Sequence, residues 1–465
     1  MIKNKQLLLI ILIIFILAAA GSAVGVGNIW RFPYLCAKDG GGLFLLVYLV
    51  LVLTFGFVLL TTDVAIGRKT KKNALRAFEA LNPKWKFLGK LTFLVPTLIM
   101  TYYSVIGGWI TKYFVTYIIS DGTDAAADGY FTSFITSDIA PIVFMLVFLA
   151  LTAWIVFRGV EKGIEQFSKI IMPLLIILVI GIAIFSITIK KTGDDGIVRT
   201  GVEGLKLYLI PNLDGLTVKS FFTVLLDAMG QLFFSLSVAM GIMIAYGSYV
   251  KDDAALNKSV GQIEIFDTVV ALLAGFMVVP AVYVFSGEAG TKASGAGLMF
   301  VTLPKVFEQM RGGTIIGILF FVLVFLAALT SSISIMEAIV SSFMDRFGIS
   351  RKKSVAICII ISIIMGIPSS LGNGAWAHIK ILGMDFLTFF DYISNSVLMP
   401  IVALCTCILI GWAAGAKTVT DEVKRNGEKM NREKLYNVMI KYIAPVMLVI
   451  ILITYSLAQF GFFTM

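Results

Sequence analysis

The chain has 465 residues, of which 58% are hydrophobic and only 14% are charged. A water-soluble domain could not bury so large an apolar fraction, whereas a lipid bilayer accepts it, so the composition indicates an integral membrane protein. The net charge of +10 lies in short loops between apolar segments, which favours a membrane surface over nucleic acid as the partner. Most zinc chemistry and any disulfide scaffold are excluded by one isolated histidine and by cysteines without framework spacing: His378, Cys36, Cys358, Cys405 and Cys407.

Apolar segments long enough to cross a bilayer, about 20 residues each, recur along the whole chain. Backbone polar groups in lipid must be satisfied within the segment, so these runs are predicted to be helices. No linker or soluble appendage separates them, and residues 1–465 are therefore predicted to form one all-α transmembrane domain. The eleven predicted spans are 7–37, 42–66, 91–119, 139–157, 167–189, 221–249, 265–285, 314–344, 355–371, 386–414 and 438–460.

The loops between the spans differ in charge. Those after the second, eighth and tenth spans are rich in lysine and arginine, whereas the loop after the third holds four aspartates and no basic residue. By the positive-inside rule the even-numbered loops are cytoplasmic, which places the N terminus inside the cell and the C terminus outside. A competing interpretation is a cleavable signal peptide, with Lys3 and Lys5 before an apolar stretch and small residues at 18–23. Loop charge does not separate the two interpretations.

Two of the spans carry helix-breaking or polar residues near their middle. Gly21, Gly25 and Gly27 disfavour helix in the first span, and Asn28 and Arg31 are costly in lipid. The sixth span has polar side chains at mid-depth within residues 231–241. An unwound segment frees carbonyl oxygens that suit Na⁺ and exposes a half-helix N terminus that suits a carboxylate. The alternative is that the glycines only permit close helix packing.

The spacing of the two breaks favours a binding site. They lie five helices apart, and a repeat of five helices must insert its second copy upside down. Equivalent breaks in helices one and six therefore predict inverted repeats, roughly residues 7–190 and 218–414, with 438–460 as an extra helix. Such paired interruptions indicate the substrate site of a transporter.

Three stretches carry a more specific signal: 21–33 followed by Lys-Asp-Gly-Gly-Gly at 38–42, then 230–240, and Leu-Thr-Ser-Ser-Ile at 329–333. They resemble the neurotransmitter:sodium symporter family, particularly its bacterial amino-acid transporters. The resemblance implies a multi-pass protein of the cell membrane, not an enzyme. Its expected activity is sodium-coupled symport of a neutral amino acid by alternating access, with two Na⁺ sites.

The resemblance also implies ligands for the two ions. One sodium would be held by the carbonyls of Gly21, Val24 and Ala327 and the hydroxyls of Thr330 and Ser331. From the residues alone, these hydroxyls could equally bond to carbonyls of their own helix. The second sodium would be held by the Ala23 carbonyl, Asn28, Ser235, Asp267 and a substrate carboxylate. The family commonly has threonine and asparagine at the positions of Ser235 and Asp267, and both replacements keep an oxygen ligand.

Asp267 also bears on chloride. A carboxylate in an apolar span is costly unless it meets a cation, another partner or a proton. Chloride-dependent relatives place a serine at the position of Ala271, which has no hydroxyl. We therefore expect chloride-independent transport, with the charge of Asp267 substituting for the anion.

The substrate pocket follows from the same resemblance. Monoamine carriers of the family have an aspartate at the position of Gly25, so glycine favours a substrate with its own carboxylate. The side-chain pocket contains no charged residue, which favours apolar or aromatic side chains. The substrate backbone would be held by Ala23, Gly25, Gly27, Tyr103 and Ser235, and its side chain by Ile99, Phe234, Ser237, Met240 and Ile335, with Ser331 as a further substrate-binding residue.

Gates are expected on both sides of the site. Arg31 and Asp391 would pair above it, and Tyr249 and Asp345 match the family's inner gate. The arginine and tryptophan that usually precede helix one are replaced here by Gln6 and Leu9, and Lys3 or Lys5 is a substitute for the arginine.

Two further intramembrane acids, Asp63 and Glu337, would share a proton if they lie close together, which makes proton counter-movement a hypothesis. Other interpretations of the chain are a proton-coupled or exchanging amino-acid permease of the same fold, a channel, and an amino-acid sensor that does not transport. Polar residues concentrated at two breaks argue against a channel, and the Thr330–Ser331 pair argues against a permease without sodium.

Overall fold

The computed structural model describes residues 19, 21–193, 196–291 and 295–459, and most of them are helical. The first half contains η1 (Gly27–Arg31), α2 (Phe32–Lys38), α3 (Gly42–Leu51), η2 (Val52–Gly56), α4 (Phe57–Thr70), α5 (Ala74–Leu81), η3 (Pro83–Trp85), α6 (Lys86–Ile119), α7 (Thr123–Ala126), α8 (Tyr130–Ile135), α9 (Ala140–Phe157), η4 (Val160–Glu165), α10 (Gln166–Thr188), β1 (Lys190–Thr192), β2 (Val198–Thr200) and α11 (Gly201–Leu209). The two strands pair antiparallel, with Lys190 opposite Thr200.

The second half begins with the interrupted pair α12 (Val218–Ser235) and α13 (Ile242–Tyr249), followed by the long α14 (Leu256–Thr291). It continues with α15 (Gly295–Gly297), η5 (Leu298–Thr302), α16 (Leu303–Gln309), α17 (Gly313–Phe347), α18 (Arg351–Leu371), α19 (Phe386–Asp391), η6 (Tyr392–Leu398), α20 (Met399–Ile408), η7 (Leu409–Ala413), α21 (Lys417–Lys424), α22 (Glu433–Val438), η8 (Met439–Ile443) and α23 (Ala444–Gln459).

Within the described residues, nine segments are long and apolar enough to cross a membrane. The two predicted spans missing from this set are the first, which lies partly outside the described residues, and the sixth, which is divided into α12 and α13. Most helices run past the predicted ends into polar residues; the third span, for example, covers Pro83–Ile119 rather than 91–119. The total of eleven, the inverted repeat and the orientation stay predictions.

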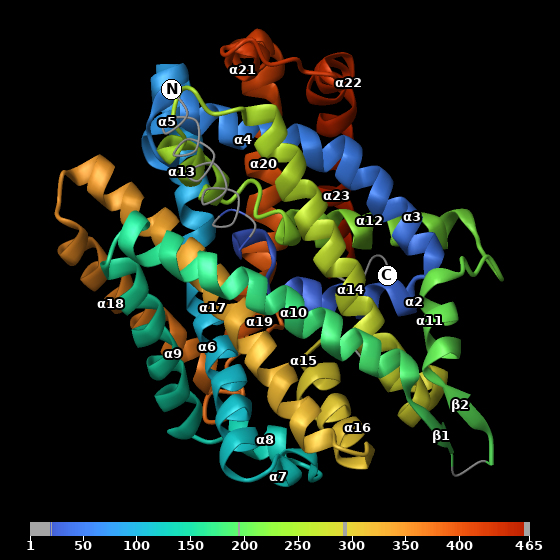
Figure 1. Cartoon of the computed structure of the whole chain (residues 1–465). Coiled ribbons are helices and arrows are strands. Elements are labelled where there is room, and N and C mark those ends of the chain that lie inside the picture. The colour runs from blue at the N-terminus through green and yellow to red at the C-terminus, as the bar shows by residue number, and fades with distance from the viewer. Residues whose placement is uncertain (1–18, 20, 194–195, 292–294, 460–465) are drawn as a thin grey trace, which may run out of the picture.

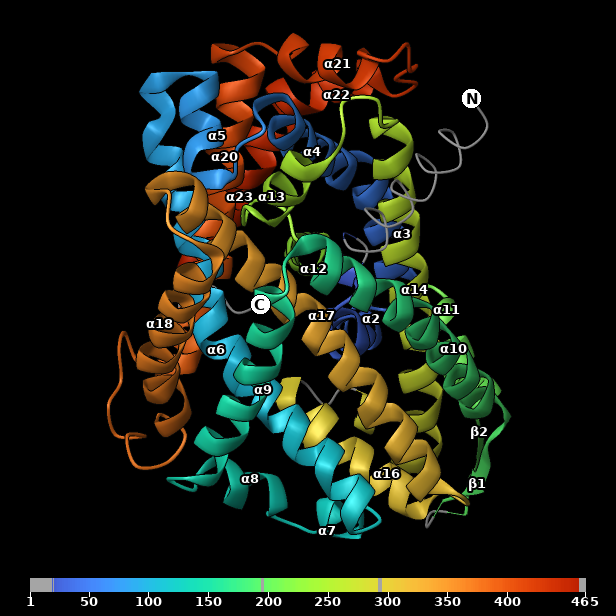
Figure 2. The same ribbon diagram turned by 60° about the vertical axis from the view of Figure 1, so that its left-hand side comes forward.

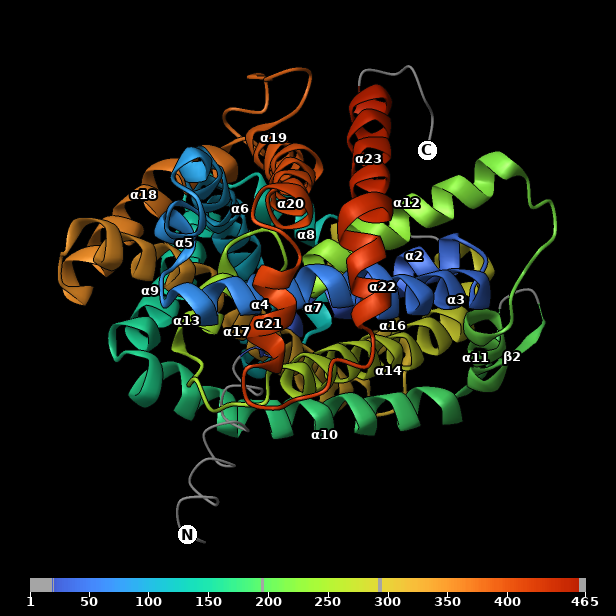
Figure 3. The same cartoon turned by 90° about the horizontal axis from the view of Figure 1, so that it is seen from above.

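The longest helices cross the molecule obliquely and pack closely on one another. Helix α17 lies beside α6 in Figures 1 and 2, and α6 also packs on α9. A Cβ atom on Gly108 of α6 would come within 2.6 Å of the Met145 backbone nitrogen in α9. Small residues therefore let these helices meet backbone to backbone, as is common in membranes. Helix α23 stands at the edge of the molecule beside α20 (Figure 3).

The loops of opposite charge lie at opposite ends of the molecule. In Figure 1, α5, α21 and α22 gather at one end and α7, α8 and the β1–β2 hairpin at the other. We call the first the inner end, since it carries the basic loops predicted to be cytoplasmic, and the second the outer end. This separation agrees with the charge pattern on which the orientation was predicted.

Candidate functional site

The predicted interruptions are present in both helices and face each other. Helix α12 ends at Ser235 and α13 begins at Ile242, while Val24 and Gly25 form a bend before η1. The Ser237 hydroxyl donates to the Ser22 carbonyl oxygen at 3.1 Å. Because this bond joins the two breaks directly, the non-helical segments form one polar region inside the helical bundle.

The break between α12 and α13 is stabilised by Asp63, for which the sequence suggested a different role, the sharing of a proton with Glu337. Ser237 and Ala239 have φ angles of 53° and 60°, in the left-handed region that non-glycine residues rarely adopt. Asp63 of α4 accepts a hydrogen bond of 3.0 Å from the Ala239 backbone N–H. This buried carboxylate thus stabilises the unwound backbone. The signal in the sequence was an acid in an apolar helix, which requires a donor, but the sequence did not identify the donor.

The predicted ligands of one sodium site are brought together around a single carboxylate. Asp267 Oδ1 accepts hydrogen bonds from Asn28 Nδ2 at 2.8 Å and from the Ser235 hydroxyl at 2.7 Å. All three residues are at most 1% exposed. The Tyr48 hydroxyl, not anticipated from the sequence, lies 3.4 Å from Asp267 Oδ2. We call Asn28, Ser235 and Asp267 the carboxylate cluster.

The carboxylate cluster has the chemistry that a hard cation needs. Carboxylate, hydroxyl and amide oxygens are the ligands that hard cations prefer. The Asn28 carbonyl Oδ1 accepts from the Gly25 backbone N–H at 3.2 Å, so its amide nitrogen faces Asp267. A cation between these residues would require the amide to turn and present oxygen. The exchange of amide N and O is a modest local change.

The other predicted ligands lie where α17 meets the first break. The Ser331 hydroxyl is 3.4 Å from the Ser22 carbonyl oxygen. A Cβ atom on Gly25 would lie 2.5 Å from the same Ser331 hydroxyl oxygen. The Thr330 hydroxyl instead donates to the Ala327 carbonyl of its own helix at 3.0 Å. Thr330 therefore makes the bond to its own helix that was the alternative, whereas Ser331 reaches the first break, and the sodium site stays a prediction. Gly21, Val24 and Ala327 are buried around the same junction.

A small cavity of about 20 Å³ lies between the breaks. The Tyr103 hydroxyl is buried there and makes no hydrogen bond within the described part of the chain. Nine predicted substrate residues line the cavity, and Ile242 joins them as a residue that the sequence did not suggest. Of the predicted set, Gly27 and Ser235 stand outside this lining. The lining residues are Ser22, Ala23, Gly25, Asn28, Ile99, Tyr103, Phe234, Ser237, Met240, Ile242, Ser331 and Ile335.

Phe234 and Tyr103 separate this cavity from a larger one toward the outer end, since both side chains line both spaces. A Cβ atom on Gly27 would lie 2.5 Å from the Phe234 ring, so glycine there lets the ring approach η1 closely. The larger space, which we call the outer cavity, has a volume of about 430 Å³. The phenyl ring therefore lies between the small cavity and the outer cavity.

The predicted outer ion pair is not closed. Arg31 and Asp391 both line the outer cavity, but their charged groups are not within the 4.0 Å of an ion pair. Asp391 instead accepts from Asn395 Nδ2 at 2.6 Å, and Asn395 also donates to the Tyr102 hydroxyl at 2.9 Å. The two groups are apart in this structure because the outer cavity separates η1 from α19, and their role as a gate stays a prediction.

At the inner end the predicted pair takes different partners. The Tyr249 hydroxyl donates to Glu337 Oε1 at 2.7 Å, and Arg351 binds the same carboxylate through two nitrogens at 2.6 and 2.9 Å. Asp345 lies 3.4 Å from the Lys72 ammonium. Glu337 therefore binds an arginine and Asp63 binds a backbone amide, so the two acids are not partners of each other. Gln6, Leu9, Lys3 and Lys5 lie outside the described residues.

Comparison with known proteins gives consistent matches over nearly the whole chain. A model of the sodium:neurotransmitter symporter family matches residues 12–123 and 135–464. An uncharacterized sodium-dependent transporter of Bacillus subtilis is 33% identical over 94% of both chains. The sodium- and chloride-dependent taurine transporter of Rattus norvegicus is 26% identical over 88% of this chain and 71% of its own.

Among solved structures, the crystal structure of MhsT in complex with L-phenylalanine matches with a TM-score of 0.84 at 36% identity. The match covers 95% of this chain and 98% of that one. The helical arrangement described above is therefore shared with a solved protein along almost its full length.

Proposed function

The chain belongs to the sodium:neurotransmitter symporter family, and we propose that it carries a neutral, hydrophobic or aromatic amino acid into the cell together with Na⁺. The observation that carries this proposal is the carboxylate cluster beside a closed cavity that contains an unpartnered Tyr103 hydroxyl. A buried hydroxyl without a partner is costly, and a substrate carboxylate would satisfy it. On these grounds the chain is a transporter rather than an enzyme.

The lining of the small cavity supports this class of substrate. Ile99, Met240, Ile242 and Ile335 are apolar, so a charged side chain would lose its hydration without compensation. The structural relative MhsT binds L-phenylalanine, and its match is the reason to test aromatic amino acids first. Because the present cavity is small, such a side chain enters only if Phe234 and its neighbours move outward.

Sodium would act as a coupled substrate at two places. The carboxylate cluster with the Ala23 carbonyl offers one oxygen cage, and the carbonyls of Gly21, Val24 and Ala327 with the Thr330 and Ser331 hydroxyls offer another. Both cages include backbone of the first break, so a cation in either one would hold that break in place. The amino acid would bind the same segment, which couples the binding of the two substrates.

Transport would proceed by alternating access around this site. Closure of the outer cavity would bring Arg31 to Asp391 above Phe234. Release to the cytoplasm would require separation of the Tyr249–Glu337–Arg351 contact and of Asp345 from the loop before α5. The two ends would not open together, because each arrangement is stabilised by contacts that the other breaks.

We further propose that transport is independent of chloride. Asp267 supplies a fixed negative charge in the carboxylate cluster, and Ala271 offers no hydroxyl one helical turn later. The mammalian relative named above as chloride-dependent would need the anion where this chain has the carboxylate. Unchanged uptake after chloride is replaced by gluconate is the expected result.

The proposed setting is the cell membrane, crossed eleven times, with the N terminus in the cytoplasm and the C terminus outside. The basic loops at one end and the acidic loop at the other support this orientation. Labelling of single cysteines introduced in the loops at 121–138 and 417–432 from one side of intact cells distinguishes the two orientations.

Uptake into proteoliposomes tests the function. A panel of labelled amino acids is supplied with an inward gradient of Na⁺ or of K⁺ and without a pH gradient. Accumulation of apolar or aromatic amino acids only under Na⁺ is expected. Equal uptake under both cations would favour a proton-coupled or exchanging permease, and binding without accumulation would favour a sensor.

A further inference from the structure

A cluster of charged groups lies outside the sites described above, between the end of α2 and the middle of α12. The Lys38 ammonium is 2.7 Å from Asp227 Oδ2 and 3.8 Å from Asp39 Oδ1. The side chain of Asp39 is only 5% exposed and that of Asp227 only 10%. Two carboxylates thus share one ammonium in a largely dehydrated place.

The backbone after Asp39 is fixed by the loop that follows α11. Gly40 and Gly41 have φ angles of 83° and 58°, and a Cβ atom on Gly41 would overlap the Leu207 carbonyl oxygen. The Asn212 backbone N–H donates to the Gly40 carbonyl at 3.0 Å. Because this turn packs backbone against backbone, Asp39 cannot swing its carboxylate into water without breaking it.

One oxygen of Asp39 lacks a donor. Asp39 Oδ2 is buried and accepts no hydrogen bond within the described part of the chain. The Asp227 carboxylate is within hydrogen-bonding reach, but a carboxylate cannot donate. A single proton on Asp39 would supply the missing donor and would also remove the repulsion between two like charges.

The surrounding groups favour this protonated form. Burial raises the pKa of the Asp39 carboxyl to about 7, the negative charge of Asp227 raises it as well, and Lys38 opposes both. Asp39 lies outside the predicted membrane spans, in the loop between the first two. The titratable groups on the elements packed around it are Tyr34, Cys36 and Lys38 on α2, Arg31 on η1, Tyr208 on α11, Asp214 in the following loop, Lys219 and Asp227 on α12, Glu288 on α14 and Tyr455 on α23.

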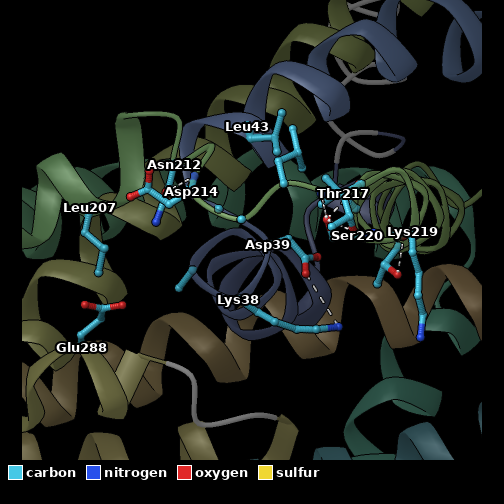
Figure 4. Close-up of a pocket in the computed structure, with 17 residues that line it drawn as sticks. Lys38, Asp39, Leu43, Leu207, Asn212, Asp214, Thr217, Lys219, Ser220 and Glu288 are labelled. Carbon is cyan, nitrogen blue, oxygen red and sulfur yellow. Dashed lines mark hydrogen bonds and ion pairs between the residues drawn. The ribbon is translucent and has the colours of Figure 1, made fainter. Parts of the chain in front are cut away.

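A path from the outside leads to the cluster. A cavity of about 470 Å³ is lined by Lys38, Asp39, Asp214, Lys219 and Ser220 among others. Figure 4 shows Asp39 and Lys38 at the end of α2, with Asn212 and Asp214 on one side of them and Thr217, Ser220 and Lys219 on the other. Residues 212–219 are exposed and Asp39 lines the cavity, so water reaches the Asp39 side of the cluster from the predicted outer face.

We propose that Asp39 and Asp227 form a binding site for one proton taken from the outside medium, with Lys38 balancing the charge that remains. On binding, the Asp39 carboxyl becomes the donor to the Asp227 carboxylate, and no other bond changes. The pair then carries one negative charge against one ammonium, so the contact between α2 and α12 tightens. On release the proton returns to external water.

The position of this site connects it with transport. Helix α2 continues directly from η1, which carries Asn28, and α12 ends at Ser235 before the break, where Asn28 donates to the Ser235 hydroxyl at 3.0 Å. A tighter contact between their outer ends would change the affinity for Na⁺ and amino acid as external pH falls. This consequence rests on the proposed function, whereas the proton site itself does not.

Infrared difference spectroscopy of the purified full chain tests the site without any transport. The carbonyl stretch of protonated carboxyl groups is recorded across about two pH units on either side of neutrality. We expect one band with a midpoint near pH 7 that is lost in Asp39→Asn. Asp214→Asn, which removes an acid from the same cavity, is the matched control and should keep the band. An unchanged band in Asp39→Asn would overturn the proposal.

Asp227→Asn provides a second test should Asp39→Asn not fold. It keeps the Asp39 carboxyl but removes the neighbouring negative charge, so the midpoint of the band should fall by about one pH unit or more. An unshifted midpoint would mean that the two carboxylates do not share a proton.

Sodium-dependent uptake of labelled L-phenylalanine against external pH is then compared between wild type and Asp39→Asn. Loss of the band with no uptake in either protein would sustain the proton site and contradict the transport function.

Discussion

The two ends of the molecule are held in different ways. At the inner end, buried or half-buried ion pairs join separate segments of the chain: Arg68 with Glu422, Glu337 with Arg351, and Glu264 with Arg432. At the outer end, Arg31 and Asp391 face a cavity of about 430 Å³ without such a pair. The difference indicates a conformation closed on the inner side and still accessible from the outer side.

The charged groups at the two gates also differ in whether they have partners. Arg68 is fully buried, and its guanidinium donates to the side chain and to the backbone carbonyl of Glu422 and to the Ala254 carbonyl. Such a group is satisfied only in the closed arrangement. Charges that face an open cavity are hydrated and remain free to pair later. At the inner gate the Glu337–Arg351 pair is thus already made, whereas at the outer gate the Arg31–Asp391 pair is still to be made.

The largest expected effect comes from breaking the most buried pair. Glu422→Gln removes the charge that Arg68 requires, which leaves a buried cation unpaired and should lower the free energy of unfolding by about 3–5 kcal/mol. Chemical denaturation in detergent measures this loss. Lys424→Ala serves as control, since its pair with Glu433 is more than a third exposed on both sides and should contribute less than about 1 kcal/mol. Equal losses in both variants would show that the buried pair contributes no more to the free energy of unfolding than an exposed one.

The next effect concerns the inner gate. Glu337→Gln removes the carboxylate bound by Arg351 and Tyr249, and charge-assisted bonds of this kind contribute roughly 2 kcal/mol. The closed inner side should therefore lose about 30-fold in population relative to the open one. Reactivity of a cysteine introduced at Ser341 toward a thiol reagent should increase accordingly. If reactivity does not change, Glu337 does not hold the gate.

Uptake should also keep its dependence on internal pH in this variant, because Glu337 is paired with an arginine rather than sharing a proton with Asp63.

A smaller effect is expected at Asp39, near the outer end. The pKa of this carboxyl is raised above its value in the unfolded chain, so the folded state binds the proton more tightly. The stability from this group is present at low pH and is lost as pH rises toward about 7. Between pH 6 and 8 the free energy of unfolding should fall by about 1 kcal/mol more in wild type than in Asp39→Asn. Parallel pH curves for the two proteins would exclude this contribution.

The smallest effect on stability is expected for the open gate. Asp391→Asn removes a carboxylate that faces the outer cavity without an ion pair, so the free energy of unfolding should change by less than about 1 kcal/mol. Sodium-dependent uptake should nevertheless fall by about tenfold or more, because closure requires Arg31 to meet this carboxylate. A large loss of stability would show that the pair is already formed at rest.

Much of the site could be predicted from residue types alone. Glycines and polar residues in the middle of apolar spans disfavour continuous helix, and both breaks are found where they were predicted. The family resemblance places Asn28, Ser235 and Asp267 in one group, and their hydrogen bonds in the structure agree with that grouping. Tyr48 and Ile242 were missed, because nothing in an apolar helix marks the side that faces a ligand.

The chain by itself determined the membrane class, the positions of the broken helices and the need of each buried acid for a partner, because these depend on hydropathy, backbone preference and desolvation. Only the tertiary structure decided which partner each acid has. Asp63 binds the Ala239 amide, Glu337 binds Arg351, and Asp39 meets Asp227. Each contact joins different helices, and rotation of one helix by a fraction of a turn would select another neighbour. Partner choice is therefore a property of packing, which no local pattern of residues encodes.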